Sequence, residues 1–174
     1  MTKHIIITGA SRGIGAAIRT RFEQEDARVF AVASKDFDLA TDSGAGALWD
    51  AGLAALDGRV DVLINNAGVF ENNPLDASES DWLAGWERTM QINLTSSALL
   101  CRRAVLHWQD RKGEGRIVNI ASRAAYRGDS PQHWHYAASK GGMVAMTKSI
   151  ARAYAGQGIL AYTICPGFTM TGMA

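Results

Sequence analysis

A tyrosine, a lysine and a serine in the C-terminal half of the sequence have the chemistry for proton transfer. Tyr136 and Lys140 stand four residues apart in Tyr-Ala-Ala-Ser-Lys, so on a helix their side chains share a face. A free tyrosine has a pKa of about 10, and a neighbouring ammonium lowers it by stabilising the phenolate. Ser122 follows the apolar run 117–120, where its hydroxyl could hydrogen-bond a substrate carbonyl. An ordinary amphipathic helix is the alternative for the Tyr–Lys pair alone.

A glycine-rich turn near the N-terminus has the features of a phosphate-binding loop. It follows the apolar run 5–8 and opens a helical pattern. A pyrophosphate must approach backbone N–H groups at a helix N-terminus, and side chains would obstruct it. Gly9 suits the tight turn, Gly13 the close approach, and Gly15 the packing of helix on strand. A glycine-rich turn without a ligand is the alternative. The dinucleotide-binding residues predicted here are Gly9, Ser11, Arg12, Gly13, Ile14 and Gly15.

A second small-residue loop follows the apolar run 60–65. Its sequence is Asn65-Asn66-Ala67-Gly68. Ligands of parallel sheets bind at the carboxyl ends of strands, and the small Ala67 and Gly68 would let the backbone pass close to a cofactor ribose. The two asparagines could tie neighbouring strands together. Asn and Gly also favour plain β-turns, which is the alternative for this motif alone.

The pattern of the whole chain predicts how these loops are positioned. Strands are expected at 5–8, 29–33, 60–65, 116–120 and 159–164, with a short one near 37–39; helices are expected at about 14–25, 48–56, 82–109 and 136–155. Apolar strands separated by helices indicate a parallel sheet covered on both faces. We therefore expect a single α/β domain over 1–174, a doubly wound, Rossmann-like sheet. The second and third strands are too close for a helix, so one crossover is expected to be a loop.

Composition narrows the class of protein. The 174 residues carry 18 Lys and Arg against 17 Asp and Glu. This balanced charge lacks the basic excess typical of a nucleic-acid-binding protein, so we expect no nucleic-acid partner. No signal peptide and no membrane span are expected, so the sequence fits a soluble cytoplasmic protein. Cys101 and Cys165 are expected to be free thiols. His133 and His135 lack a third ligand at metal-binding spacing; we expect them at a pocket rim or in a loop and expect no metal.

The motifs, in this order, resemble the short-chain dehydrogenase/reductase family, in its compact 3-oxoacyl-reductase-like branch. The resemblance rests on Gly-x3-Gly-x-Gly after the first strand, the Asn-Asn-Ala-Gly loop, and the serine placed before Tyr-x3-Lys. It implies hydride transfer between a nicotinamide cofactor and a carbonyl or secondary alcohol. Catalysis would fall to Ser122, Tyr136 and Lys140, with Asn93 holding a water that links the lysine to solvent. Ser122 stands one position farther from Tyr136 than usual, which predicts a one-residue insertion within 128–135.

The resemblance also assigns the remaining cofactor contacts. Asp38 and Leu39 would meet the adenine ring, and the Cys-Pro-Gly segment after the last strand would bind the nicotinamide carboxamide through Pro166, Gly167, Thr169 and Thr171. Many NAD-dependent members carry an acid where this sequence has Ala33. Arg12 and Lys35 could instead bind a 2′-phosphate, beside Ser34. We therefore expect NADP(H) in preference to NAD(H).

The length of the chain leaves an alternative to catalysis. Family members continue past the position of Ala174 with a helical lid, one more strand and a last helix. The rival interpretation is therefore a cofactor-binding but catalytically silent interaction or regulatory module, which the intact Ser-Tyr-Lys set opposes.

The resemblance also predicts the partners of this protein. Helices matching 86–109 and 136–155 would pair in a homodimer or homotetramer. The substrate is expected to be a small molecule, in a pocket shaped by residues 123–134.

Overall fold

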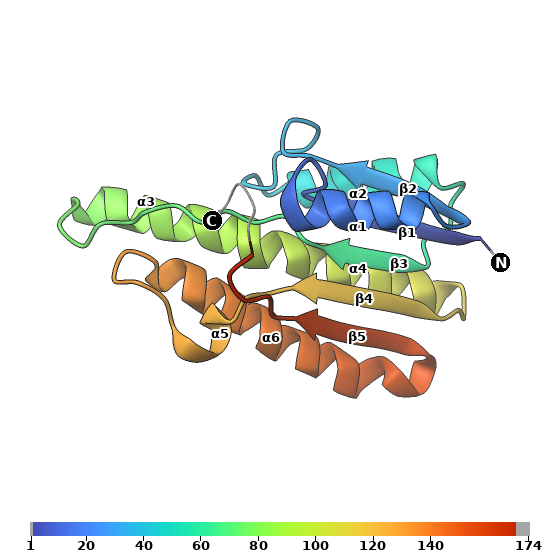
Figure 1. The fold of residues 1–174 in the computed structure, drawn as a ribbon. Helices are drawn as coiled ribbons and strands as arrows, with labels where there is room; N and C mark the ends of the chain where they lie inside the picture. Colours follow the sequence, from blue (N-terminus) through green and yellow to red (C-terminus); the bar gives the residue numbers. More distant parts are fainter. Residues whose placement is uncertain (1, 170–174) are drawn as a thin grey trace.

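Short, apolar strands build a parallel sheet at the centre of the protein (Figure 1). The computed structural model describes residues 2–169. Its five strands lie in the order β2-β1-β3-β4-β5, and every neighbouring pair is parallel. Ile5, Ile6 and Ile7 of β1 are fully buried, because the sheet is covered where β1 crosses it. The strands are β1 (Lys3–Thr8), β2 (Ala27–Val32), β3 (Val62–Asn65), β4 (Gly115–Ile120) and β5 (Ile159–Ile164).

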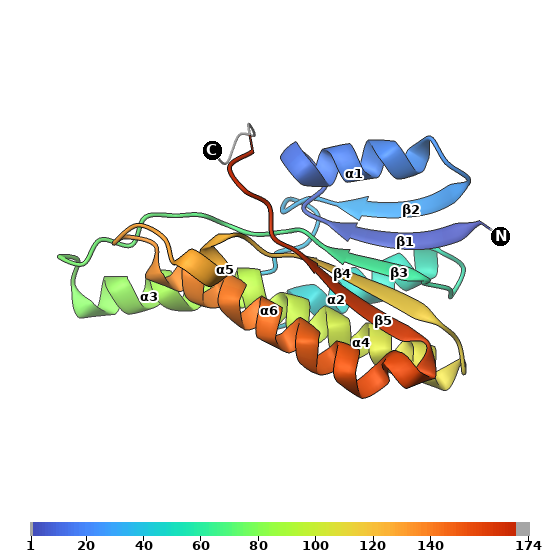
Figure 2. The same ribbon diagram turned by 60° about the horizontal axis from the view of Figure 1, so that its bottom comes forward.

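Helices cover both faces of this sheet, as expected for a doubly wound α/β fold (Figure 2). Side chains of α1 pack on the face that carries Ile5 and Ile7. The opposite face, which carries Ile6, packs against α2, α4 and α6. No helix among residues 2–169 has the length and apolar character needed to cross a membrane. The helices are α1 (Gly13–Glu23), α2 (Gly44–Ala55), α3 (Glu79–Met90), α4 (Ser96–Asp110), α5 (Ala124–Arg127) and α6 (Trp134–Tyr154), with a 3-10 turn η2 (Ala155–Gln157).

The strand predicted at 37–39 does not form. Residues 33–43 form turns instead, in which the Asp36 carboxylate accepts the Ala33 N–H at 2.8 Å and the Asp38 carboxylate accepts the Ala40 N–H at 2.9 Å. Such side-chain bonds compete with the hydrogen bonds of a sheet. The described sheet therefore has five strands, not six. The crossover expected as a loop is absent too, since α2 connects β2 directly to β3.

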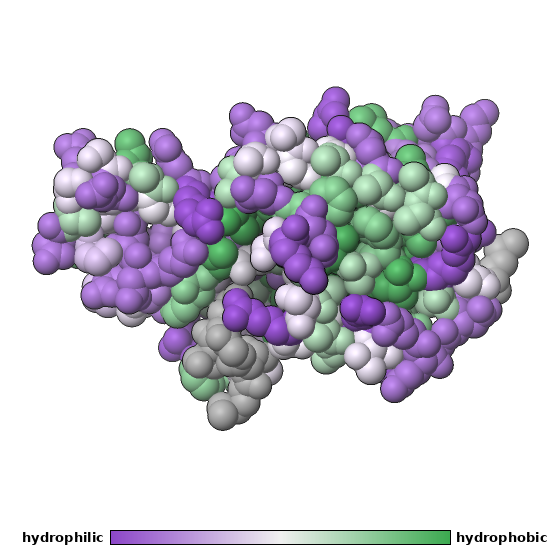
Figure 3. Space-filling model, turned by 90° about the horizontal axis from the view of Figure 1, so that it is seen from above, coloured by the Kyte–Doolittle hydropathy of each residue, from purple (hydrophilic) through white to green (hydrophobic). Residues whose placement is uncertain are grey.

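Loss of that strand leaves β2 at the edge of the described sheet. Val29, Phe30 and Ala31 are only partly buried there. Figure 3 looks down on this side of the molecule and shows apolar surface gathered at the centre, with hydrophilic residues around it.

The helical stretch predicted at 82–109 is interrupted once. Helix α3 begins after Ser78, whose hydroxyl accepts the Asp81 N–H at 3.1 Å, and it projects beyond the sheet (Figure 1). A π-helical turn, η1 (Gln91–Thr95), joins α3 to α4 and contains Asn93. Such turns widen a helix locally and are frequent at functional sites. The four-residue helix α5 was not predicted.

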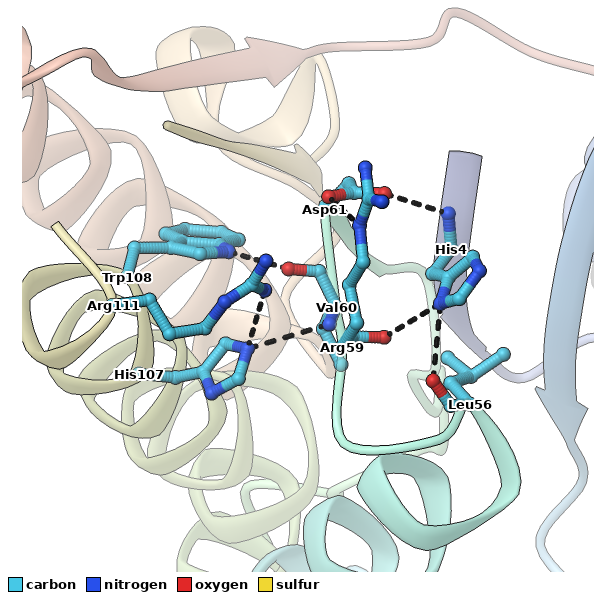
Figure 4. A network of polar contacts seen from close by, with 8 residues as sticks. All are labelled: His4, Leu56, Arg59, Val60, Asp61, His107, Trp108 and Arg111. Atoms are coloured by element: carbon cyan, nitrogen blue, oxygen red, sulfur yellow. Dashed lines mark hydrogen bonds and ion pairs between the residues drawn. The ribbon is translucent and has the colours of Figure 1, made fainter. Parts of the chain in front are cut away.

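A polar clamp ties the amino ends of β1 and β3 to the ends of two helices (Figure 4). His4 and Asp61 exchange hydrogen bonds: the His4 N–H donates to the carboxylate at 2.9 Å, and the Asp61 N–H donates to the His4 carbonyl at 2.8 Å. The Trp108 indole donates to the Val60 carbonyl at 2.7 Å, and the Val60 N–H donates to Nε2 of His107 at 3.3 Å. This clamp lies at the end of the sheet where the strands begin, opposite their carboxyl ends.

The acceptor role of His107 predicts a pH-dependent stability. Nε2 accepts only in the neutral ring, and burial followed by the Arg111 charge lowers the pKa of His107. A pKa lowered in the folded state makes this contribution complete above the unfolded pKa of about 6.5 and lost as pH falls below it. We expect His107→Gln, whose carbonyl accepts without titrating, to lose less stability than the parent between pH 7.5 and 5. Urea unfolding at each pH measures this, and parallel losses in the two proteins would contradict it.

Candidate active site

A cleft of about 500 Å³ runs along the carboxyl ends of the strands. The loops after β1, β3 and β4 contribute to its wall, together with the segment after β5 and the start of α6. Sixteen of the predicted site residues line it: Gly9, Ser11, Arg12, Gly13, Ile14, Ser34, Asp38, Leu39, Ala67, Gly68, Ser122, Tyr136, Lys140, Pro166, Gly167 and Thr169. Gly15, Lys35, Asn65 and Asn93 do not line it, and Thr171 lies outside the described residues.

The glycine turn is shaped for a close approach of backbone. Gly9 and Gly13 have φ of +66° and +56°, a region that favours glycine. A Cβ on Gly15 would stand 2.2 Å from the Gly9 carbonyl oxygen, so Gly15 lets the start of α1 lie against the turn that follows β1, and not against the strand itself as expected. The first turn of α1 has no acidic residue. Its positive helix end and free space suit an anionic group, so these residues fit the pyrophosphate of a dinucleotide.

The loops after β1 and β3 are hydrogen-bonded to each other. The Thr8 hydroxyl accepts the N–H groups of Asn66 and Ala67, both at 3.0 Å. The Asn66 side-chain amide donates to the carbonyls of Thr8 and Gly9, at 3.1 and 2.9 Å. Sequence reasoning did not single out Thr8, although a β-branched hydroxyl at a strand end is a common partner for loop backbone.

Asn65 lies in the interior instead of the cleft. Its side-chain amide donates to the Asn119 side chain on β4 at 2.8 Å, and Asn119 donates to the Thr147 hydroxyl on α6 at the same distance. These two hydrogen bonds link β3 and β4 to α6, the helix that carries Tyr136 and Lys140. Asn65 therefore supports the site from behind, while its neighbours Asn66, Ala67 and Gly68 face the cleft.

Three predicted catalytic side chains meet in the cleft. Lys140 is almost completely buried, and its Nζ donates to the Ile120 carbonyl at 2.9 Å, at the end of β4. Nζ is 5.8 Å from the centroid of the Tyr136 ring. Burial lowers the pKa of Lys140 to about 8. Burial also raises the pKa of Tyr136, an effect that the neighbouring Ser122 side chain opposes. The lowering of the tyrosine pKa expected from Lys140 is therefore not the dominant effect in this cleft.

Asn93 holds the loop after β3 in place. Its side-chain oxygen accepts the Val69 N–H at 2.8 Å, and its NH₂ group donates to the Val69 carbonyl at 3.0 Å and the Ser139 hydroxyl at 3.2 Å. The amide is fully buried and both of its ends are engaged. A Cβ on Gly68 would lie 3.2 Å from the Asn93 oxygen and 3.4 Å from Nζ of Lys140, so glycine gives this contact its room.

Three of the residues predicted to bind the adenosine half of a cofactor, Ser34, Asp38 and Leu39, line the cleft, and a fourth, Lys35, does not. Ala33 lines the cleft as well. Lys35 is exposed in the turn that follows β2 and does not reach the lining. The side chain that remains available for a 2′-phosphate is that of Arg12.

Several cleft residues were missed by sequence reasoning. Phe70 stacks on His133 with ring centroids 3.8 Å apart, and meets the Tyr136 ring edge-on at 4.8 Å. His133 also shares a 2.6 Å hydrogen bond with Ser130. The two histidines expected at a pocket rim or in a loop are both buried: His133 lies in the loop that leads into α6, and His135 lies in the first turn of that helix. Arg123, Arg127 and Asp129 also line the cleft, and they belong to the segment 123–134 that was expected to shape the substrate pocket. The other unpredicted lining residues are Thr8, Val32, Ala33, Leu48, Asn66, Val69, Arg88, Ile92, Ile120, Ala121 and Phe168.

Comparison with curated proteins finds relatives of known activity along almost the whole chain. The chain is 36% identical to a 3-oxoacyl-[acyl-carrier-protein] reductase of Vibrio cholerae over 188 residues, which cover 98% of this chain and 75% of the relative. It is also 36% identical to a D-threitol dehydrogenase of Mycolicibacterium smegmatis, over 97% of this chain and 71% of the relative. The chain thus spans about three quarters of the length of these proteins.

Solved structures and a family model agree with these relatives. A 4-hydroxyisoleucine dehydrogenase complexed with NADH superposes with a TM-score of 0.88 at 28% identity, over 98% of this chain and 78% of that one. A putative NAD(P)-dependent gluconate 5-dehydrogenase from Beutenbergia cavernae, with bound NADP, gives 0.86 at 31% identity, over 98% and 74%. The family model described as short chain dehydrogenase matches residues 35–174. The chain therefore belongs to the short-chain dehydrogenase/reductase family of NAD(P)-dependent oxidoreductases.

Proposed function

We propose that this protein transfers a hydride between NADP(H) and a carbonyl or secondary-alcohol substrate, with Ser122, Tyr136 and Lys140 as its catalytic residues. The observation that carries the proposal is their convergence in one cleft that also contains the glycine turn. A silent cofactor-binding module would not need a serine, a tyrosine and a buried lysine at the same end of the cleft.

The chemistry divides among the three side chains. A bound nicotinamide would supply the hydride to the carbonyl carbon, or accept it in the reverse direction. In the reducing direction, the Ser122 hydroxyl donates a hydrogen bond to the carbonyl oxygen and increases its polarity. The Tyr136 hydroxyl gives its proton to that oxygen as negative charge develops there. The Lys140 ammonium, held by the Ile120 carbonyl, stabilises the phenolate that remains.

The burial of Lys140 sets the conditions under which this chemistry works. Removing an ammonium from water favours its neutral form, which accounts for the lowered pKa of about 8. A developing phenolate on Tyr136 would favour the charged ammonium again. We assign Asn93 a positioning role: by binding Val69 and Ser139, it holds the loop after β3 beside the helix that carries both catalytic side chains.

The preference for NADP(H) is supported by charge at the adenine end. Arg12 is exposed and lines the cleft, and no carboxylate stands at Ala33 to repel a 2′-phosphate. The nearest acid along the chain, Asp36, is directed onto the Ala33 N–H. A guanidinium can bind a phosphate through two parallel hydrogen bonds. We further propose that α4 and α6 pair with a second copy in a homodimer or homotetramer, as the family resemblance implies.

Removal of one oxygen tests the mechanism. Tyr136→Phe should lower carbonyl reduction by about 100-fold or more, because the general acid is lost, and should leave NADPH binding intact. Absorbance decay of NADPH with a panel of ketones measures turnover, and protein fluorescence quenching measures binding. Tyr126→Phe is the matched control, since Tyr126 is 69% exposed and outside the cleft. Near-normal turnover by Tyr136→Phe would refute the mechanism, and no turnover by the unchanged protein would favour the silent module.

The lowered pKa of Lys140 predicts an upper pH limit for carbonyl reduction. Reduction needs a proton on Tyr136 and charge on Lys140, and both are lost as pH rises. Because the pKa of Lys140 is about 8, kcat/KM for NADPH, which reports on the free protein, should decline above about pH 8. Initial rates between pH 6 and 10 check this. A profile that stays flat to pH 9.5 would contradict the proposed role of the ammonium.

Charge reversal tests cofactor choice. Arg12→Glu should lower kcat/KM for NADPH by about tenfold or more, since a phosphate-binding charge is replaced by a repelling one, and should change the value for NADH much less. Arg19→Glu on α1 is the control, because Arg19 pairs with Glu23 away from the cleft. Equal effects on both cofactors would show that Arg12 does not select between them.

A further inference from the structure

The substrate end of the cleft carries two arginines that the proposed mechanism does not use. Arg123 follows Ser122 directly, and its N–H donates to the Pro166 carbonyl at 3.2 Å. Arg127 ends the short helix α5, four residues later. Side chains four residues apart on a helical turn lie on the same side, and both line the cleft. Their backbone is therefore anchored next to the serine that would polarise a carbonyl.

The charge balance around this pair is positive. Neither Arg123 nor Arg127 has a carboxylate within ion-pair distance among residues 2–169. Arg88, a third arginine in the cleft wall, already binds Glu71 at 3.2 Å. Asp129 is the acidic lining residue of the loop that follows α5. Two uncommitted guanidinium groups against one carboxylate leave net positive charge in a concave, partly apolar site, where an anion binds more strongly than on an open surface.

An aromatic side chain faces the same part of the cleft. Phe70 is held by stacking on His133 and contacts the Tyr136 ring edge-on. Phe70 therefore provides an apolar surface beside the catalytic tyrosine. The cleft thus combines a hydrogen-bond donor for a carbonyl, an apolar side chain beside Tyr136, and two cationic groups on the turn that follows Ser122.

From this arrangement we infer that the preferred substrate is an oxo acid, or the corresponding hydroxy acid, whose carboxylate binds to Arg123 and Arg127 while Ser122 binds the reacting oxygen. The inference rests on the proposed function, because it concerns the substrate of the same site. Guanidinium groups match the planar carboxylate and form charge-assisted hydrogen bonds with it.

A phosphate of the cofactor is the other anion that these arginines could bind in the same cleft. The two sources predict different results. If the arginines bind the substrate, their loss weakens binding of the acid and leaves cofactor affinity unchanged. If they bind the cofactor, their loss weakens NADPH binding and affects charged and uncharged substrates equally.

The experiment compares matched acids and esters in two protein variants. Pyruvate, 3-oxobutanoate and 4-oxopentanoate are titrated against their methyl esters into the NADP⁺-loaded protein, where the oxidised cofactor permits binding without reduction. Calorimetry gives Kd for each, and NADPH oxidation gives kcat/KM. The test variant is Arg123→Gln/Arg127→Gln. The control, Lys3→Gln/Lys112→Gln, removes the same charge from exposed positions that lie outside the cleft and outside α4 and α6.

We expect at least one acid to bind about tenfold or more tightly than its ester. The test variant should lose that preference and keep the Kd for NADPH and the turnover of esters, while the control variant keeps the preference. Equal or tighter binding of all the esters would overturn the inference, as would a test variant with weakened NADPH binding or with the preference intact. Binding of neither class would also overturn it. Reduction of uncharged ketones in any of these cases would leave the proposed function standing.

Discussion

The close approach of two backbone loops is the constraint on which the rest of this structure depends. The turn after β1 and the loop after β3 meet where added side-chain atoms would collide: a Cβ on Gly9 would lie 2.7 Å from the Ala67 Cα, and one on Gly15 would lie 2.4 Å from the Asn66 amide. Thr8 and Asn66 fill the remaining space with four hydrogen bonds. This contact holds α1, and therefore the glycine turn, in register with the loop that leads to the end of the cleft where Tyr136 and Lys140 lie.

The end of the cleft that contains Tyr136 and Lys140 is joined to that contact through buried polar groups. Asn93 binds the backbone N–H and the backbone carbonyl of Val69 and reaches Ser139, one residue before Lys140. The π-helical turn places Asn93 in this position without ending the helix. Buried polar networks of this kind are costly when only partly satisfied, so a change in any member should affect the whole group. The geometry around Lys140 is consequently set by side chains outside the cleft as well as inside it.

Features that follow from local sequence patterns were predicted, whereas features that depend on side-chain hydrogen bonds or tertiary packing were not. The parallel sheet, the glycine turn and the helix bearing Tyr136 follow from local patterns, namely apolar runs, glycine spacing and four-residue periodicity, and they were predicted. The strand at 37–39 was wrong because Asp36 and Asp38 bind nearby backbone N–H groups, a competition that apolar patterning does not record. Asn65 was expected to tie neighbouring strands, and it does so by binding Asn119 on β4. Its location behind the cleft could not be predicted, because Asn119 and the Thr147 that Asn119 binds are brought to it only by tertiary packing.

The two ends of the cleft also differ in what recognises the ligand. At the cofactor end much of the lining is backbone and small residues, so a few glycines reveal it in the sequence. At the other end, side chains from separate loops supply the lining, among them Phe70, Arg123 and Phe168, and no single motif contains them. Side chains on loops change readily without disturbing a scaffold. The same fold can therefore keep its glycine turn while the charge and shape of the other end change. Under the proposed function, this is why we infer the substrate from Arg123 and Arg127 and not from Ser122, Tyr136 and Lys140.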